Sequence, residues 1–344
     1  MKVALIGGTG ETGSTIVNAL LESDIPALKI IAIVRPASER KPDVVALEKR
    51  GVAVAVVDLE GPRAELVDVL EGADVLISAI HVSALGSQIP LADAAKAAGV
   101  KRFVPCFFAT VAPAKGVLTL RQLKEEALLH AKKIRLPYTV IDVGWWYQLS
   151  IPRLPSGRID SATPLPVNFI AGDGSTLSAL TDVRDVGRFT ARIIADPRTI
   201  NKMVFVYGDI LSQNQIFNML DEMSGETTKR EYASISQTQS INMPAEAMEN
   251  AIAAESLTAD AIEKSAFDNR MKIFYEYWYS MGVRGDNTLE YAEFLGYVDG
   301  TKLYPDFQPI TFEAFLKEVL DGKPVAIYRT LEQNVAKAEK KAKA

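Results

Sequence analysis

Short apolar runs alternate with amphipathic helical patterns through the first 145 residues. The apolar runs predict strands at 2–6, 29–34, 52–57, 74–79, 102–105 and 138–143. The helical periodicity between them predicts helices at 12–22, 42–50, 63–71, 86–98 and 119–134. Strands that are apolar almost throughout are typical of a parallel sheet covered on both faces by helices. The pattern therefore predicts an α/β fold with a doubly wound (Rossmann) parallel sheet.

The pattern changes after Gly144. A proline-rich stretch follows, and because proline cannot supply central strands, we expect the chain to leave the sheet there. A helix start at 181–183 and an apolar run at 203–207 predict a return to the sheet, after which helical patterns dominate from 212 to 321. We expect a nucleotide-binding domain at 1–150 and 182–208, and a second, smaller, mostly helical substrate domain at 151–181 and 209–325. Residues 326–344 are expected to form a charged tail, solvated or frayed.

Composition narrows the class of partner. The 344 residues carry a formal net charge of -5, and no basic stripe is present to neutralise a phosphate backbone, so nucleic acid is not an expected ligand. The apolar runs are strand-sized, well short of the roughly 20 residues a membrane-spanning helix needs. Cys106 is the single cysteine, which excludes an intrachain disulfide and fits a reducing, cytoplasmic location. No metal site is predicted, and the oligomeric state stays open.

A glycine-rich turn follows the first predicted strand. The glycines of Gly7-Gly8-Thr9-Gly10-Glu11-Thr12-Gly13 have the spacing G-x-x-G-x-x-G, and a helical pattern comes directly after them. Glycine lets the backbone turn tightly and approach a pyrophosphate, whose charge then lies against the free N–H groups of the helix. With a second strand about 20 residues on, this context predicts a dinucleotide site rather than a simple tight turn. We expect contacts from Gly7, Thr9, Gly10, Glu11, Thr12 and Gly13.

The second predicted strand ends in Arg35, where an NAD-specific site has an acidic residue. An arginine there pairs with a 2′-phosphate that an acid would repel, and Ser38, Arg40 and Lys41 follow closely. The pattern favours NADP(H) over NAD(H), although a surface arginine at a strand end is the alternative.

Ligands of open α/β sheets bind at the carboxyl ends of the strands. Asp58 and Leu59 are therefore expected on the adenine side, and Ala79, Ile80 and His81 on the nicotinamide side, where His81 is otherwise an ordinary loop histidine. Gly144 and Trp145 follow the sixth strand, so a cofactor contact is expected there too. Trp146, Tyr147 and Gln148 are candidates for a substrate pocket, with packing between the two domains as the alternative reading.

Lys124 is the catalytic candidate. It falls within the apolar stripe of the helix at 119–134, which contains Leu120, Leu123, Ala127, Ala131 and Ile134. A lysine on a core-facing stripe either extends its ammonium to water or serves a function beside the cofactor, as a proton donor or acceptor or as a ligand contact. The signature Tyr-x-x-x-Lys of common short-chain reductases is absent.

Several segments together resemble a known family. They are the glycine loop, Val34-Arg35-Pro36, the run from Val100 to Cys106, the helix with Lys124, and the run from Leu136 to Val143. The chain resembles the NmrA-like, isoflavone reductase-like branch of atypical short-chain dehydrogenases/reductases, and an aromatic helix at 274–279 with later motifs is similar to fungal members. The resemblance implies that Lys124 is the general acid or base and that the glycine loop and Arg35 bind NADP(H). One departure concerns 106–109, which reads Cys-Phe-Phe-Ala where the family often has an acidic residue and a glycine.

The resemblance implies an NADPH-dependent reductase of a small aromatic or secondary-metabolite substrate. Two alternatives remain open: a non-catalytic regulatory protein that senses NADP(H), and an isomerase or cyclase that requires NADPH. Lys124 and the aromatic residues favour an enzyme, whereas the missing acidic residue weakens the argument for ordinary reduction.

Overall fold

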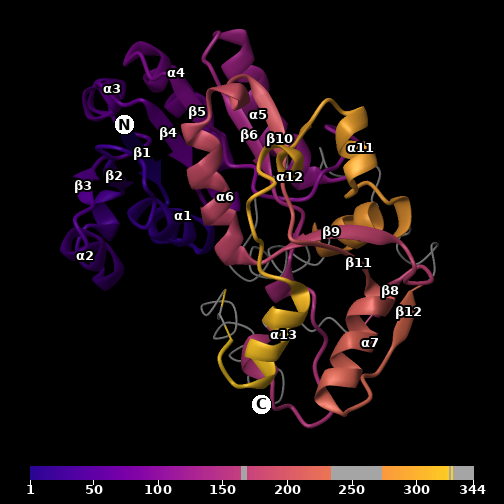
Figure 1. Ribbon diagram of the computed structural model, residues 1–344. Helices are drawn as coiled ribbons and strands as arrows, with labels where there is room; N and C mark the ends of the chain where they lie inside the picture. The colour runs from indigo at the N-terminus through magenta and orange to yellow at the C-terminus, as the bar shows by residue number, and fades with distance from the viewer. Residues whose placement is uncertain (164–168, 234–272, 325–326, 328–344) are drawn as a thin grey trace, which may run out of the picture.

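A computed structural model describes residues 1–163, 169–233, 273–324 and 327. The first part of the chain forms the parallel sheet expected from the sequence, with strand order β3-β2-β1-β4-β5 (Figure 1). Its strands are β1 (Lys2–Ile6), β2 (Lys29–Val34), β3 (Ala53–Val56), β4 (Val75–Ser78) and β5 (Arg102–Val104). The chain adds β2 and β3 on one side of β1 and β4 and β5 on the other, so the strand order reverses between β1 and β4. This is the switch point of a doubly wound sheet.

Three further parallel strands extend this sheet past β5. Phe103 pairs with Tyr138 through a single bridge, and its N–H donates to the Pro137 carbonyl at 2.8 Å. This bridge leads to β6 (Thr139–Asp142), which pairs with β10 (Lys202–Phe205), and β10 pairs with β13 (Val298–Asp299). Residues 298–299 come from the range predicted for the second domain, because a two-residue strand leaves no periodic signal in the sequence.

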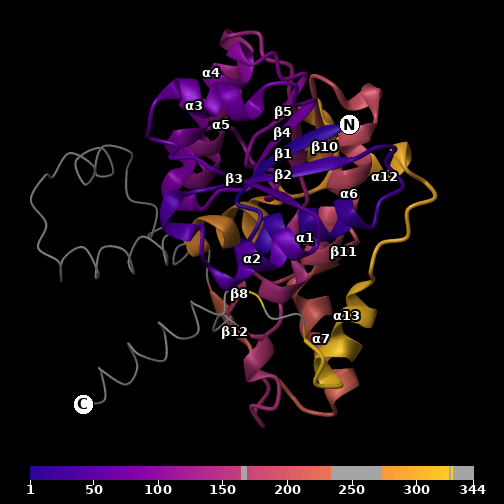
Figure 2. The ribbon, with the colours of Figure 1, turned by 90° about the vertical axis from the view of Figure 1, so that its left-hand side faces the viewer.

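Helices cover both faces of the sheet (Figure 2). On β1, Val3 and Leu5 pack with residues of α1 and α6, whereas Ala4 and Ile6 pack with residues of α3, α4 and α5. The six helices are α1 (Glu11–Leu21), α2 (Pro42–Lys49), α3 (Arg63–Leu70), α4 (Gln88–Ala97), α5 (Thr119–Lys133) and α6 (Val183–Ala195). Short 3₁₀ turns lie at η1 (Pro36–Ser38), η2 (Val82–Ser87), η3 (Tyr147–Leu149), η4 (Asp160–Ala162) and η5 (Pro197–Thr199).

The described part of the second unit combines helices with two small sheets. One sheet has the order β11-β9-β7, and the other pairs β8 with β12. The strands are β7 (Trp145–Trp146), β8 (Phe169–Ala171), β9 (Leu177–Thr181), β11 (Asp209–Ser212) and β12 (Glu231–Ala233). The helices are α7 (Gln213–Ser224), η6 (Tyr279–Arg284, a π-helix that continues helical residues 273–278), α11 (Leu289–Phe294), α12 (Gly300–Leu303) and α13 (Phe312–Leu320). The predicted tail, 326–344, lies outside the described residues except for Ile327.

A segment before α13 ties the two units together. The Phe307 ring stacks on Phe189 of α6 with centroids 3.8 Å apart, and Arg188 lies over the same ring. The backbone N–H of Ile310 donates to the Asp185 carboxylate at 2.7 Å. Aromatic and charged contacts therefore hold this segment against the sheet domain. Within the described ranges, no helix is long and apolar enough to cross a membrane.

Asp196 gives a test of the electrostatics of this fold. Its carboxylate accepts hydrogen bonds from the Arg198 guanidinium (2.7 Å), the Arg198 backbone N–H (2.8 Å) and the Tyr304 hydroxyl (3.1 Å). The Arg198 guanidinium is the main cause of a lowered Asp196 pKa. A lowered pKa in the folded state stabilises the protein above the unfolded pKa of about 4, and this stabilisation is lost as the pH falls through the folded value.

We therefore expect Asp196→Asn to lower the free energy of unfolding by about 1 kcal/mol at pH 7, with the difference from wild type narrowing below about pH 4. Urea denaturation at a series of pH values measures the free energy of unfolding of the variant and of the wild type, and so the pH dependence of their difference. Asp24→Asn is the control, since Asp24 is exposed. A difference that does not change with pH would contradict this electrostatic explanation.

Candidate active site

The β1–α1 turn can be built only with glycine at two positions. Gly7 has φ +83°, and a Cβ there would lie 2.1 Å from the Ala79 carbonyl oxygen at the end of β4. A Cβ on Gly13 would lie 2.0 Å from the Gly7 carbonyl oxygen. Helix α1 starts after Gly10 without a side-chain capping hydrogen bond, and Thr9 and Gly10 are exposed. The N–H groups of the first turn of α1 therefore face an open edge at the switch point, a site suited to an anion.

Cationic residues follow the neighbouring strand β2. Arg35 is exposed and directly precedes η1, and Arg40 and Lys41 are exposed just after it. None of the three forms an ion pair or a side-chain hydrogen bond with another residue in the described part of the chain. Because β1 and β2 are parallel neighbours, Arg35 and the glycine turn lie at the same edge of the sheet.

The other predicted cofactor contacts also lie at this edge. Asp58 and Leu59 follow β3, and Asp58 is exposed while its Oδ1 accepts from the Glu60 N–H at 3.0 Å. Ala79 lies against Gly7, and Ile80 and His81 come next. The Nδ1 atom of His81 accepts from the Ser83 N–H at 3.3 Å, an arrangement that leaves the ring proton on Nε2.

Lys124 is buried, and its ammonium is held by backbone carbonyls. Its side chain extends from α5 to the turn after β5, where Nζ donates to Cys106 O at 2.8 Å and to Phe107 O at 2.7 Å. The Cys106 thiol is 3.4 Å from the Ile80 carbonyl oxygen, so this turn contacts the loop after β4. Backbone carbonyls thus occupy two of the three ammonium N–H groups, and the third has a long contact of 4.0 Å to the Cys106 Sγ atom. Lys124 lies beside the edge that carries the glycine turn.

The buried stripe of α5 differs from the predicted stripe, most strongly at Leu123 and Arg121. Leu123, expected to face the core, is 41 % exposed, whereas Arg121 is 1 % exposed. Arg121 donates to Asp142 Oδ2 at 2.6 Å, to the Tyr297 hydroxyl at 2.5 Å and to Glu125 Oε1 at 2.8 Å. Sequence reasoning missed Arg121 because a helix stripe ranks residues by hydrophobicity, whereas burial of this arginine depends on Asp142 and Tyr297, which are distant in sequence.

Opposite charge explains how Arg121 is tolerated in the core. Burial by itself would lower the pKa of Arg121, but Asp142, Tyr297 and Glu125 outweigh that cost and hold the pKa well above its usual value. Burial, and after it the Asp142 carboxylate, raise the pKa of Tyr297 well above 10. Tyr297 therefore keeps its proton, which it donates to Asp142 Oδ2 at 2.5 Å.

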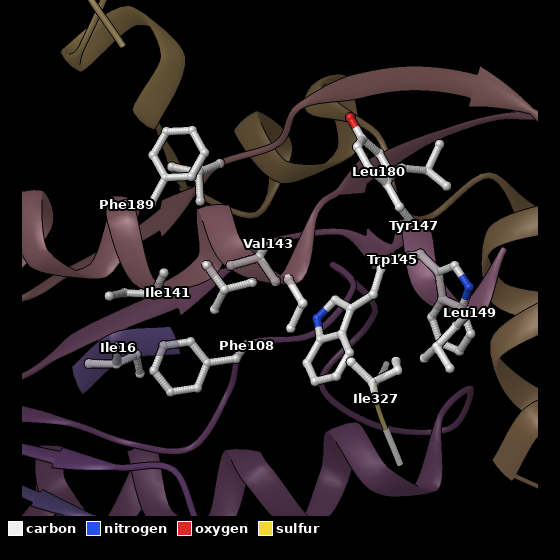
Figure 3. Packing of buried hydrophobic residues seen from close by; sticks show 14 of the residues in the cluster. Ile16, Phe108, Ile141, Val143, Trp145, Tyr147, Leu149, Leu180, Phe189 and Ile327 are labelled. Carbon is white, nitrogen blue, oxygen red and sulfur yellow. The ribbon is translucent and has the colours of Figure 1, made fainter. Parts of the chain in front are cut away.

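The residues predicted for a substrate pocket, which follow β6, are buried. Tyr147 is fully buried, and its hydroxyl is 3.1 Å from both Asp209 Oδ2 and the Ile310 carbonyl. The Gln148 Oε1 atom accepts from the Val183 N–H at 3.2 Å. Trp146, Tyr147 and Gln148 are all buried, as in the alternative of packing between the two domains, and a part in a substrate pocket stays a prediction for them. Figure 3 shows Tyr147 directed away from Trp145.

Trp145, which directly precedes these residues, is the centre of an aromatic cluster. Its ring centroid lies 4.9 Å from that of Tyr277, 5.4 Å from that of Trp278 and 6.4 Å from that of Phe274. Trp145 belongs to the same buried hydrophobic cluster as Phe108, which lies in the turn that holds Lys124, and Figure 3 labels both residues. Gly144, with φ +71°, precedes it, and a Cβ there would lie 2.5 Å from the Ala179 carbonyl oxygen. The cluster thus connects the second unit to the Lys124 turn.

A cavity of about 30 Å³ lies beside Trp145 and Trp278. It also contacts Ser150, Thr176 and Gln213. The Nε1 atoms of both tryptophans are buried and have no hydrogen-bond partner in the described part of the chain. This volume holds a water-sized group but no aromatic ring. In the same ranges, no group of three or more His, Cys, Asp or Glu side chains is placed to hold a metal ion.

A glycine turn at the switch point of a doubly wound sheet, with a cationic strand end beside it, is the arrangement of dinucleotide-binding α/β proteins. The chain belongs to the NmrA-like family, whose model matches residues 1–316.

Curated relatives share most of the chain. It is 46 % identical over 327 residues to an asnovolin J 5′,6′-dehydrogenase of Aspergillus novofumigatus, covering 94 % of this chain and 96 % of the relative. It is 28 % identical to an isoflavone reductase homolog of Zea mays, covering 93 % and 98 % of the two chains. The structure resembles a leucoanthocyanidin reductase–NADPH complex from Vitis vinifera, with a TM-score of 0.73, 20 % identity and coverage of 93 % and 100 %. These relatives agree with the family resemblance and the fold class expected from the sequence.

The glycine turn gives a direct structural test. We expect Gly13→Ala to lower the free energy of unfolding by about 1–3 kcal/mol, because the new Cβ forces the Gly7 carbonyl to move. Gly86→Ala is the control, since a Cβ at Gly86 meets open space. Chemical denaturation of both variants measures the difference, and equal stability would refute the close contact between Gly13 and Gly7.

Proposed function

We propose that this protein is an NADP(H)-dependent oxidoreductase that reduces a small aromatic or other secondary-metabolite substrate. The carrying observation is the placement of Lys124, which is buried and held on the carbonyls of Cys106 and Phe107 beside the glycine turn. Oxidoreductase names among the relatives, with 46 % identity to one of them, support the same reaction class.

The residues at the carboxyl edge fit NADP(H). The glycine turn is a cradle that a Cβ at Gly7 or Gly13 would fill, and it leaves the start of α1 open for a pyrophosphate. Arg35, with Arg40 and Lys41, would hold the 2′-phosphate, because the three cations are exposed and not paired within the described residues. Asp58 and Leu59 would border the adenine, and Ala79, Ile80, His81, Gly144 and Trp145 would border the nicotinamide side.

In this proposal, bound NADPH supplies the hydride. Lys124 would donate a hydrogen bond to an oxygen of the substrate with its third N–H, exchanging the long 4.0 Å contact to the Cys106 Sγ atom for a stronger one. Charge that develops on that oxygen would be stabilised most strongly where water is excluded. Lys124 is only 7 % exposed, so little water reaches its side chain. The same lysine would deliver a proton or receive it when the reaction runs in reverse.

The substrate class is argued from the aromatic cluster and from the relatives. Trp145, Tyr277 and Trp278 form a buried aromatic cluster, and surroundings of this kind suit a ring system that carries a carbonyl or conjugated alkene. One relative is named as a dehydrogenase of asnovolin J, and one structural neighbour was solved with NADP+ and pinoresinol. We propose a ring-containing ketone or enone, taken up as a free small molecule in the cytoplasm.

Lys124→Met tests the catalytic assignment. We expect kcat to fall by about 100-fold or more, while the Kd for NADPH changes little, because the variant removes the donor but not the glycine cradle. NADPH absorbance followed with a panel of aromatic ketones and enones measures kcat, and fluorescence titration measures Kd. Lys133→Met is the control, since Lys133 is exposed on the same helix.

Unchanged turnover in Lys124→Met would remove the catalytic role from Lys124. Tight binding of NADPH by the wild type with no oxidation on any substrate, and with no reduction of NADP+ by the corresponding saturated compounds, would instead favour a regulatory sensor or an isomerase.

Arg35→Ala tests the cofactor preference. We expect the Kd for NADPH to rise by about tenfold or more while the Kd for NADH stays within about twofold, because only NADPH carries the 2′-phosphate. Fluorescence titration with both cofactors measures the two constants. Equal weakening for NADPH and NADH would mean that Arg35 does not bind the 2′-phosphate.

A further inference from the structure

A buried network lies one helical turn from Lys124. Arg121 and Lys124 share the buried face of α5, three residues apart. The Arg121 guanidinium binds Asp142 from β6, Glu125 from its own helix and Tyr297 from the segment before β13. Asp142 and Arg121 are 0 % and 1 % exposed. The network thus joins α5 and the next strand, β6, to a residue that lies 155 positions after Asp142.

Phe107 connects this network to Lys124. The guanidinium of Arg121 lies over the Phe107 ring, 4.7 Å from its centroid. The carbonyl of the same residue accepts from Lys124 Nζ at 2.7 Å. The next residue, Phe108, has φ +42°, an uncommon backbone conformation for a bulky side chain that surrounding contacts must hold. Its N–H donates to the Ile141 carbonyl at 2.8 Å, directly before Asp142.

We propose that Arg121, Asp142 and Tyr297 are positioning residues that set the location of the Lys124 ammonium through Phe107. This inference rests on the proposed function, in which Lys124 acts on the substrate. Arg121 would fix the Phe107 ring, the ring would fix the turn, and the turn carbonyls hold Nζ. Tyr297 belongs to the C-terminal half of the chain, so that half contributes to the alignment of the lysine.

Stability alone is a poor explanation for this network. A buried ion pair is costly to desolvate, and well-packed apolar residues of similar volume are often as stable or more so. Here the cost is higher, because Asp142 Oδ1 and the Thr110 hydroxyl are buried without a hydrogen-bond partner in the described residues. The network instead fixes the orientation of the Arg121 guanidinium. Its N–H groups are hydrogen-bonded to Asp142, Tyr297 and Glu125, and its planar face covers the Phe107 ring.

Tyr297→Phe is the mildest test, since it removes one hydroxyl and leaves the ring. Arg121→Lys keeps the charge but not the planar fork, so a positioning role predicts no rescue, whereas a need for positive charge alone predicts rescue. Arg102→Met is the matched control. Arg102 is another buried arginine, 4 % exposed, which binds Ile193 O and Asp196 O at the opposite end of β5 from Phe107.

Two readouts separate positioning from folding. The first is the rate at which limiting acetic anhydride acetylates Lys124, measured by peptide mass spectrometry relative to exposed Lys115, which needs no turnover. The second is the split between kcat and KM with NADPH and the best ketone or enone. We expect Tyr297→Phe and Arg121→Lys to raise the rate of Lys124 acetylation about fivefold and to lower kcat about tenfold, with KM little changed. Arg102→Met is expected to change neither quantity. All variants are compared at a temperature where each is folded.

Unchanged acetylation of Lys124 in Tyr297→Phe and Arg121→Lys would overturn the proposal, and so would an equal change in Arg102→Met. If the wild type turns over no substrate, the reductase assignment fails, but the acetylation rates still decide whether the network positions Lys124. Rescue by Arg121→Lys would assign the effect to charge and refute positioning through Phe107.

Discussion

The close contact between the glycine turn and the end of β4 is the constraint on which the site depends. Gly7 lies so near the Ala79 carbonyl that no side chain fits between them. The following residue, Ile80, accepts from the Cys106 thiol, and the Cys106 carbonyl in turn accepts from Lys124. The ends of β1, β4 and β5 are therefore joined to α5 over a few consecutive contacts. Helix α5 starts 106 residues after the end of the glycine turn. These short contacts nevertheless bring its Lys124 to the same edge of the sheet.

Helix α5 buries two cations, and backbone and carboxylate oxygens make this possible. Lys124 uses two carbonyls, and Arg121 uses Asp142, Glu125 and the Tyr297 hydroxyl. The start of the helix is held from the second unit, where Glu276 accepts from the Thr119 N–H at 2.8 Å. Glu276 directly precedes Tyr277 and Trp278, which pack on Trp145. The aromatic cluster and the helix that carries Lys124 are thus parts of one packed structure, consistent with a substrate site formed between the two units.

The sequence was a good guide wherever the signal is local. Each predicted strand from 2–6 to 138–143 is present with ends that differ by at most two residues, because apolar runs and glycine turns act over a few neighbours. It failed where partners are distant. Burial of Arg121 requires Tyr297, 176 residues away, and nothing near either residue indicates the pairing. The small sheet formed by β8 and β12 has strands of three residues, which are too short for an alternating pattern to be recognised in the sequence. Tyr147 and Gln148 follow a strand end, yet their polar atoms bond inside the core.

The central claim is that this protein transfers hydride with NADP(H) at the edge where Lys124 is held. The most direct measurement supplies NADPH carrying deuterium at C4, in separate samples labelled on each face, with a ring-containing enone or ketone, and follows the label by mass spectrometry. The account predicts that one face transfers its deuterium to a carbon of the product, in step with NADPH consumption, and that Lys124→Met suppresses this transfer. Product that forms while both labelled cofactors keep their deuterium would contradict it, since the chemistry would then proceed without hydride transfer.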